Sequence, residues 1–331
     1  MKGWPPNQGP SDNVKNRVWA VPSDSEPIRL DAFARHCLPH LSMNEIQRVI
    51  GEKAFWVNQR AGKKGDTLFA GDLLTLRGFQ ELLAARPLPG RELKVSILYE
   101  DDSILVMDKP AGMSVHGFSG RATKTLANFL AAVRPSLSNI GESRWEHGIV
   151  HRLDRDTSGL VLAAKDQDSF ETLRLQFRDA SIRKKYWALV HGKMQKEGEV
   201  RFPLIHDPTD RRKMKALLQE GGETKSPKKR RWNATTRFRC VDSKEGFSLL
   251  EIEMETGVTH QIRTHMSAID HPLVGDSLYG KDRLDPFGLG RQFLHAFYLK
   301  FHHPRSGEVL VIQSPLPEEL SEVLRHLEIS V

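Results

Sequence analysis

Apolar residues recur with a helical period where the ordered part of the chain is expected to begin. The first helix face consists of Leu30, Phe33, Ala34, Cys37 and Leu38. Because proline cannot continue a helix, Pro39 must lie beyond its end. Ser42 and Glu45 have the spacing of a capping box, which predicts the start of a second helix. The inward-facing residues of that second helix are Ile46, Val49 and Ile50.

Short strands follow these two helices. Residues 54–57 (AFWV) and 73–76 (LLTL) have strand patterns, with turn residues between them. Residues 1–27 contain five prolines and no apolar period, so we interpret them as a flexible tail. We therefore predict a small domain over residues 28–78, close to the lower size limit for independent folding, followed by a linker over residues 79–92.

From residue 93 onward, strands and helices mix without a regular alternation. The buried-strand candidates are residues 104–107, 161–164, 186–190 and 249–254. Helical patterns occupy residues 125–133 and 169–178. An irregular order of this kind favours an α+β fold over a doubly wound parallel sheet. We predict one α+β domain over residues 93–331.

Length and composition narrow the class of protein. The chain has 331 residues, which fits two domains, and its two cysteines exclude a disulfide scaffold and a four-cysteine zinc site. Cys37 and Cys240 lie far apart, as expected in a reducing compartment. No apolar run approaches the roughly 20 residues that span a bilayer, and the first ten residues lack the apolar core of a secretory signal. We expect a soluble, cytoplasmic and monomeric protein without a membrane partner.

The positive charge is concentrated in one stretch. The formal net charge is +7, and residues 206–239 supply all of it, with eleven Lys and Arg residues against four acids. Clustered positive charge suits a polyanion, because each neutralised phosphate releases a counterion. The alternative is a solvated loop whose lysines serve solubility. Charge alone does not decide between these interpretations.

The densest polar cluster lies between two apolar strands, in the sequence GIVHRLDRDTSGLVLAAKD (148–166). Polar groups between buried strands lie at the mouth of a sheet, where functional sites are commonly built. Asp154 has Arg152 and Arg155 close by in sequence, and nearby positive charge favours an ionised carboxylate. Such an aspartate can act as a nucleophile or a general base. The alternative is an ion-paired turn.

Metal and cofactor chemistry find no support in the sequence. His147 and His151 are four residues apart, but Gly148 and the β-branched residues after it favour a strand, and no Glu follows His147 as the helical zinc motif requires. Two other histidine pairs lack a third ligand and are interpreted as polar or buried structural residues: His260 with His265, and His302 with His303. We predict no metal and no cofactor, so that side chains alone carry any chemistry.

Several ordered segments resemble the motifs of the RluA-type pseudouridine synthases, which isomerise uridine in RNA. The most specific is HRLDRDTSGLVL at 151–162. The others are EDDSILVMDKPAGMSVHG (100–117), RKKYWALVHG (183–192), GVTHQIRTHMS (257–267), HPLVGDSLYG (271–280) and RQFLHAFYLKFHHP (291–304). The likeness covers most of residues 93–317. It implies the pseudouridine synthase fold, an α+β domain with a mixed, largely antiparallel central sheet and flanking helices.

The resemblance also implies roles for individual residues. Asp154 matches the catalytic aspartate, which attacks either the anomeric carbon or the uracil ring. Arg263 matches the arginine that pairs with it, and such a pair keeps the carboxylate ionised and directed. Tyr186 matches the tyrosine that lies against the target base, and its hydroxyl could help to remove the ring proton. Arg152 matches the arginine that fills the stack when the uridine flips out. Ordinary ion pairing and core packing are the alternatives for Arg152 and Tyr186.

Further RNA contacts are expected from charged residues near this motif. Within the motif we expect contacts from His151, Arg152 and Arg155. Residues 219–232 have no counterpart in the likeness and form a basic insertion, whose expected phosphate-binding residues are Lys228, Lys229, Arg230 and Arg231. Two positions depart from the family pattern: Val258 stands where Arg or Lys is usual, and Met107-Asp108 where an aliphatic residue and Asn are more frequent.

Residues 29–76 resemble the small α-L RNA-binding domain known from a ribosomal small-subunit protein. The likeness is carried by RLDAFARHCLPHLSMNEIQRVI, AFWVNQR and LFAGDLLTL. Met43 stands where arginine is usual, which reduces the expected RNA affinity of this domain. A docking or stabilising role is the alternative.

The leading hypothesis is an RNA pseudouridine synthase, an isomerase that acts on uridines of structured RNA without a cofactor. Large-subunit ribosomal RNA is the favoured substrate, because the N-terminal domain is commoner in ribosomal enzymes, and transfer RNA is the alternative. A rival hypothesis is a non-catalytic RNA-binding or ribosome-assembly protein on the same scaffold. The joint presence of Asp154, Tyr186 and Arg263 argues against it. A metal-dependent nuclease lacks a credible carboxylate cluster.

Overall fold

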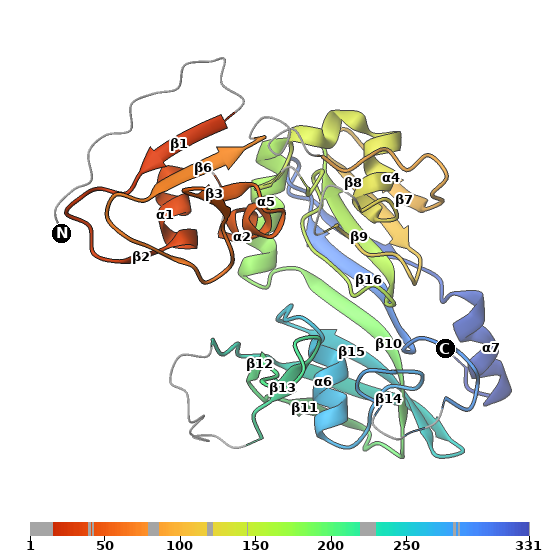
Figure 1. The fold of residues 1–331 in the computed structure, drawn as a ribbon. Helices are drawn as coiled ribbons and strands as arrows, with labels where there is room; N and C mark the ends of the chain where they lie inside the picture. The colour runs from red at the N-terminus through yellow and green to blue at the C-terminus, as the bar shows by residue number, and fades with distance from the viewer. Residues whose placement is uncertain are drawn as a thin grey trace. The chain divides into compact units, whose positions relative to one another are not determined.

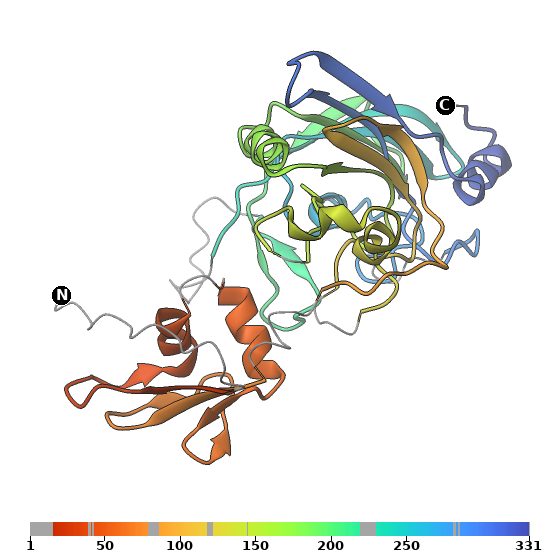
Figure 2. The same ribbon diagram turned by 90° about the horizontal axis from the view of Figure 1, so that it is seen from above.

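The computed structural model describes most of the chain. The described residues are 16–38, 41, 43–78, 86–117, 122–143, 145–218, 230–280, 283 and 285–330. They form two compact units, which divide between Arg86 and Pro87 (Figures 1 and 2).

The N-terminal unit packs two helices against one face of a small sheet. The helices are α1 (Leu30–Cys37) and α2 (Met43–Gly51). The sheet has the strand order β1 (Asn16–Ala20), β6 (Leu73–Arg77), β3 (Phe55–Val57) and β4 (Arg60–Ala61), and a second pair joins β2 (Ile28–Arg29) to β5 (Thr67–Leu68). Both helical predictions are confirmed, and Ile46, Val49 and Ile50 are buried.

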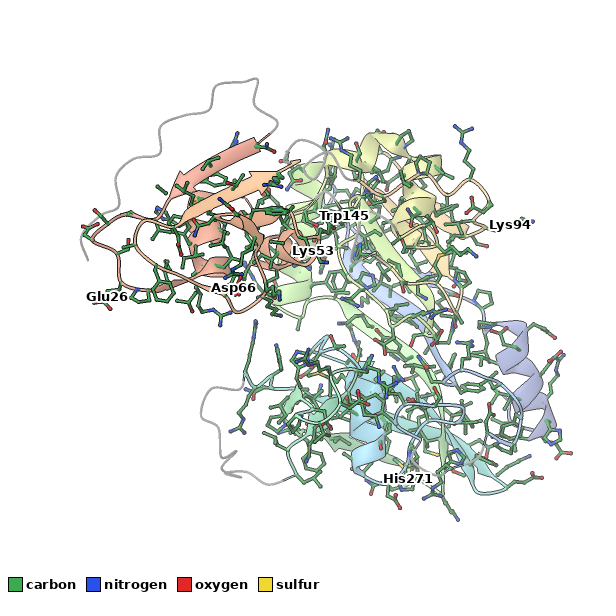
Figure 3. All side chains as sticks on the ribbon, in the orientation of Figure 1. Glu26, Lys53, Asp66, Lys94, Trp145 and His271 are labelled. Carbon is green, nitrogen blue, oxygen red and sulfur yellow. The ribbon has the colours of Figure 1, made fainter. Side chains whose placement is uncertain are left out.

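Asp66, labelled in Figure 3, accepts the backbone N–H of Lys63 and pairs with Arg60 at 2.6 Å.

The first strand corrects one prediction. Residues 16–20 pair antiparallel with β6, and Val21 is buried, so the expectation of a flexible tail over residues 1–27 is wrong for this part. The strand is short, and Val18 is 58% exposed on its outer side, which leaves only a weak alternation in the sequence. Its hydrogen-bond partner lies more than 50 residues further along the chain, where no local pattern reveals it. Residues 1–15 lie outside the described residues.

The second unit is built on a mixed nine-stranded sheet. Its strand order is β11-β14-β15-β10-β16-β9-β8-β7, with β17 also paired to β16. The strands are β7 (Ser96–Glu100), β8 (Ile104–Lys109), β9 (Ser158–Ala164), β10 (Arg183–His191), β11 (Glu197–Val200), β14 (Thr236–Lys244), β15 (Phe247–Met254), β16 (Leu294–His302) and β17 (Val309–Gln313). Only the β9–β16 pair is parallel, so the predicted α+β class with a largely antiparallel sheet is confirmed.

Helices cover both faces of this sheet. The helices are α4 (Leu126–Val133), α5 (Gln167–Arg178), α6 (Gln261–Ala268) and α7 (Glu318–His326), with the 3₁₀ turn η1 (Pro135–Asn139) after α4. Strand β8 is buried on both sides: Leu105 packs in the cluster that contains α4 and α6, whereas Val106 packs in the cluster that contains α5. Two-sided burial explains why β8 and β9 are continuous apolar runs in the sequence. A separate hairpin joins β12 (Leu204–His206) to β13 (Met214–Ala216).

The polar segment 151–157 lies between two anchored backbone stretches. Before it, the N–H of Val150 donates to the carbonyl of Leu162. After it, β9 begins at Ser158, wedged between β8 and β16. Gly159 has φ +114°, and a Cβ there would lie 2.3 Å from the carbonyl oxygen of Ala296. Glycine is therefore required at the point where the loop enters the sheet.

We predict that Gly159→Ala lowers the free energy of unfolding by about 3–5 kcal/mol, because the backbone of β16 must move. Gly246 is the matched control: its φ is +80°, and nothing lies within 4 Å of an added Cβ. Gly246→Ala should cost only about 1–2 kcal/mol of backbone strain. Urea unfolding followed by circular dichroism measures both. Equal losses of unfolding free energy in the two variants would show that contact with Ala296 is not the reason that residue 159 must be glycine.

Candidate active site

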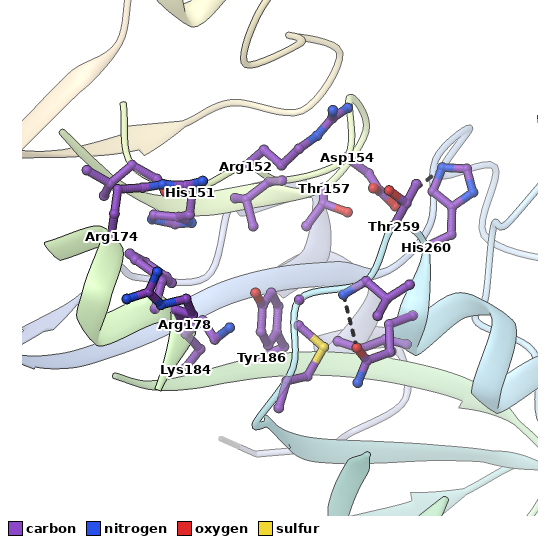
Figure 4. A pocket seen from close by; sticks show the side chains of 18 of the residues that line it. His151, Arg152, Asp154, Thr157, Arg174, Arg178, Lys184, Tyr186, Thr259 and His260 are labelled. Carbon is purple, nitrogen blue, oxygen red and sulfur yellow. Dashed lines mark hydrogen bonds and ion pairs between the residues drawn. The ribbon is translucent and has the colours of Figure 1, made fainter. Parts of the chain in front are cut away.

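A cavity of about 800 Å³ opens in the second unit (Figure 4). Its walls come from the 151–157 segment, from α5, from β10 and from the stretch 257–263 that leads into α6. Its volume lies within the usual range for pockets that bind small groups. The cavity combines the polar cluster predicted from sequence with residues about 100 positions further along the chain.

Asp154 lies in the wall of the cavity with its side chain 19% exposed. Its Oδ2 accepts a hydrogen bond from Nη1 of Arg263 at 3.1 Å. The same oxygen lies 3.8 Å from Nε2 of His260. The structure thus brings together Asp154 and Arg263, which the sequence motifs predict as a pair across 109 positions. Arg263 and His260 both contact Oδ2, so Oδ1 has no ion-pair partner among the described residues.

Arg263 is held in place by a second carboxylate, Asp276. Nε of Arg263 donates to Oδ2 of Asp276 at 2.7 Å, and Nη2 donates to Oδ1 at 2.9 Å. The Asp276 side chain is fully buried and also accepts the backbone N–H groups of Leu278 and Tyr279. A two-point contact of this kind fixes the guanidinium plane, and Nη1 is then directed at Asp154.

Electrostatics keep this guanidinium charged. Burial alone would lower the pKa of Arg263, but its hydrogen bonds to Asp276 and the negative charges of Asp276 and Asp154 raise that pKa above the ordinary value. The ring of Tyr279 lies 5.1 Å from the Arg263 guanidinium carbon and adds a cation–π contact. Asp154 therefore always faces a full positive charge.

His260 contacts the same group from the start of α6. Its Nδ1 hydrogen-bonds the Tyr279 hydroxyl at 2.9 Å. Burial lowers the pKa of His260, although the charge of Asp154 opposes this, so a neutral ring is favoured at neutral pH. His260 belongs to the site, whereas the sequence pattern predicts only a polar or structural residue. His265 is structural as predicted: it is buried and bonds Thr236 and the carbonyl of Phe202.

Tyr186 stands on β10, on the wall opposite Asp154 and Thr157 (Figure 4). The residue is 5% exposed. Burial, with a smaller contribution from the charge of Asp154, raises the pKa of its hydroxyl above the ordinary value. The phenol therefore stays protonated at neutral pH. Tyr186 lines the cavity, and its contact with a target base stays a prediction.

The far end of the cavity is basic. Lys184, Arg174 and Arg178 line it, and Figure 4 shows Arg178 and Lys184 close together beside Tyr186. Burial lowers the pKa of Lys184 to about 8, so its ammonium is still mainly charged at neutral pH. Two acids, Glu142 and Glu171, also line the cavity, and Glu142 pairs with Arg174 at 3.6 Å. Lys184 and Arg178 form no ion pair with the described residues, so they supply the positive charge that attracts an anionic, phosphate-bearing ligand.

The other residues of the polar cluster hold the loop. Burial and the charge of Lys184 lower the pKa of His151 to about 3, and Nε2 of the neutral ring accepts the N–H of Leu162 at 3.0 Å. Arg155 is exposed and donates from Nε to the carbonyl of Gly112 at 3.1 Å. Arg152 is exposed at the rim of the cavity. Contacts of these three residues with RNA stay predictions. His151 stabilises the loop through its hydrogen bond with Leu162.

Lys109 holds the 151–157 loop by a hydrogen bond from the protein interior. Its side chain is fully buried, and Nζ donates to the carbonyls of Pro110, Met113 and Arg155 at 2.8–3.1 Å. Burial lowers the pKa of Lys109 to about 7. The Lys-Pro-Ala-Gly turn therefore supports the 151–157 segment by hydrogen bonds.

Several site residues carry no role in the sequence-based prediction, among them Asp276, His260 and Lys184. The signal for Asp276 is a carboxylate in the stretch LVGDSLY, which has apolar residues on both sides of it. A buried carboxylate requires a cationic partner. Nothing in the sequence identified Arg263 as that partner.

The basic insertion is only partly described. Lys228 and Lys229 lie outside the described residues. Arg230 and Arg231 are exposed, and the Arg230 guanidinium lies 5.2 Å from the ring of Trp232. Within the described ranges, no group of three or more His, Cys, Asp or Glu residues is arranged to hold a metal ion. The same described residues contain no helix of the length and apolarity needed to span a membrane.

Comparisons with known proteins agree on one family. The family model described as RNA pseudouridylate synthase matches residues 103–268. "Ribosomal large subunit pseudouridine synthase D" of Nitrosomonas europaea is 35% identical over 324 residues, which cover 96% of this chain and 89% of that protein. An "Uncharacterized RNA pseudouridine synthase" of Chloroflexus aurantiacus is 38% identical, with 95% of each chain covered. Among solved structures, "Human RNA Pseudouridylate Synthase Domain Containing 4" is 25% identical with a TM-score of 0.55, covering 71% of this chain and 94% of that one.

We predict that Asp276→Asn lowers the free energy of unfolding by about 3–5 kcal/mol, because it leaves a buried guanidinium without its main partner. Glu318→Gln is the control, since Glu318 and Arg325 form an exposed ion pair with side chains 73% and 64% exposed. Its effect should stay below about 1 kcal/mol. Urea unfolding of the full chain measures both. A loss for Asp276→Asn as small as that of the control would contradict the anchoring role.

Proposed function

Because the chain belongs to the RNA pseudouridine synthases, a family of isomerases, we propose that Asp154 is the nucleophile with which it isomerises uridines of large-subunit ribosomal RNA. The observation that carries this assignment is the Asp154–Arg263–Asp276 arrangement at the wall of the cavity. It supplies one partly exposed, charge-stabilised carboxylate opposite an aromatic ring. Those are the groups that uridine isomerisation needs from side chains.

The reaction breaks the bond between the ribose C1′ and uracil N1 and forms a bond from C1′ to uracil C5. The proton on C5 is lost, and N1 gains one, so the net change is an isomerisation. A carboxylate that adds either to C1′ or to the uracil ring holds one fragment while the ring turns. Arg263 and His260 both lie against Oδ2 of Asp154. Oδ1 is therefore the oxygen we assign to the attack.

The other residues position the base and the RNA. Tyr186 lies against the uracil, and its raised pKa favours this positioning role over that of a general base. Arg152, exposed at the rim, takes the place of the uridine in the stack after the base leaves the helix. Lys184 and Arg178, at the basic end, bind backbone phosphate.

Large-subunit ribosomal RNA is the proposed substrate because relatives that are 35% identical over 84–89% of their length are named ribosomal large subunit pseudouridine synthase D. The likeness of the N-terminal unit to an α-L RNA-binding domain supports the same choice. Transfer RNA is the second candidate. We propose that the protein acts in the cytoplasm, in keeping with its two free cysteines, and that it acts as a monomer. The proposed nucleophile, in place with its partners, argues against a purely structural RNA-binding role.

We predict that Asp154→Asn reduces pseudouridine formation by about a thousandfold or more, because an amide cannot act as the nucleophile. RNA affinity should change little. Asp156→Asn is the matched control: Asp156 lies in the same loop, is 48% exposed and contacts only Arg155 at 3.9 Å among its ion pairs. Carbodiimide-blocked primer extension on ribosomal and transfer RNA, after incubation with each purified variant, measures the product. Full activity of Asp154→Asn would refute the assignment, and a wild type that modifies only transfer RNA would refute the substrate.

We predict that replacing Lys228, Lys229, Arg230 and Arg231 with alanine weakens RNA binding and flattens its salt dependence, because each lost phosphate contact removes up to about 0.9 from the slope of log affinity against log salt. Lys244→Ala with Arg325→Ala is the control, since both residues already pair with acids elsewhere in the fold. Filter binding at several salt concentrations gives the slopes. An unchanged slope in the fourfold variant would mean that the insertion is a solvated loop.

A further inference from the structure

A second cleft of about 420 Å³ adjoins the catalytic cavity. The two share Phe177, Arg178 and the backbone stretch 257–259. On its outer side, the second cleft is lined by His206 at the end of β12 and by Trp232. Its volume lies within the range of pockets for small groups. A ligand bound in the catalytic cavity can therefore extend into the second cleft.

Trp232 is fixed at the wall of this cleft. Its backbone N–H and carbonyl both hydrogen-bond Leu204, at 2.9 and 2.8 Å. The His206 ring meets the indole edge to face, with ring centres 5.2 Å apart and planes at 89°. The indole is only half-buried, although it packs on the small cluster around Leu204 and Met214. A rigid, partly exposed aromatic ring suits the stacking of a nucleobase.

Positive charge surrounds this ring. The Arg230 guanidinium lies 5.2 Å from the indole centre. Arg178, at the junction of the two spaces, is exposed, and its side chain forms no hydrogen bond or ion pair with the described residues. The one acid that lines the cleft, among its described residues, is Glu255, and Arg237 pairs with it. The charge of the cleft thus complements a phosphodiester.

We propose that the second cleft binds one unpaired nucleotide next to the target uridine, with its base stacked on Trp232 and the linking phosphate at Arg178. Consecutive nucleotides are joined through a single phosphate, and Arg178 is the cationic side chain that both spaces share. Stacking on an aromatic ring tolerates any base, because every base has a π face. This subsite therefore selects an unstacked neighbour rather than a particular sequence. The inference rests on the proposed function of the catalytic cavity.

The test is a double-mutant cycle in RNA binding with the full chain. The probe is a short stem-loop RNA that the wild type modifies, together with two copies in which the nucleotide 5′ or 3′ of the target uridine is abasic. Trp232→Ala should bind the intact RNA about tenfold more weakly, the loss expected for one base–aromatic stack. Trp232→Phe should restore most of that affinity. For the wild type, one of the two abasic RNAs should bind about tenfold more weakly than the intact RNA. For Trp232→Ala, the same abasic RNA should bind as tightly as the intact RNA.

The cycle separates a stack from a structural role. If both abasic RNAs weaken Trp232→Ala by the same factor as the wild type, the base does not contact the indole, and the inference is overturned. Thermal unfolding of each variant shows whether Trp232→Ala remains folded, and Trp232→Leu, which keeps an apolar side chain without an aromatic ring, takes its place if it does not. Loss of the abasic penalty in Trp232→Leu supports the stack, and a penalty equal to that of the wild type overturns it. Failure of the proposed function looks different, because the wild type would then leave the uridine of every candidate RNA unmodified.

Discussion

The contact between Arg263 and two carboxylates is the interaction on which the rest of the site depends. A buried guanidinium is stable only where its charge is matched and its N–H groups are satisfied. Asp276 provides this by accepting two guanidinium N–H bonds and two from the backbone. The remaining nitrogen faces Asp154. The position of the proposed nucleophile is thus set by a residue that never meets the substrate.

Two carboxylates share one cation but have opposite environments. Asp276 is sealed from solvent and its oxygens are occupied, which suits a permanent anchor. Asp154 is 19% exposed and has one short contact. A nucleophile needs a lone pair that is not already engaged. The asymmetry of the two sites meets this requirement, because Arg263 makes its two-point contact with Asp276 and only one contact with Asp154.

The sequence predicts the parts of this structure that are encoded locally. Strand β8 is found because it is a continuous apolar run, and helix α1 because its apolar residues recur with a helical period. Strand β1 is missed because its partner β6 is distant and its outer face carries Val18. The parallel contact of β9 with β16 joins residues 137 positions apart, and no local pattern encodes such a pairing. For the same reason Asp154 and Arg263 are paired only through a motif resemblance, whereas Asp276 and His260 are not identified at all.

The cationic groups that shape the cavity are not those that dominate the composition. The net charge of +7 comes from the single stretch 206–239 and indicates a polyanionic partner. Lys109 and Lys184 are buried instead, and burial lowers their pKa values to about 7 and about 8. Lys109 uses its three donors on backbone carbonyls and thereby fixes the loop of Asp154. Net charge thus identifies the class of partner, but the geometry of the site is determined by a few buried charges that composition cannot separate from the rest.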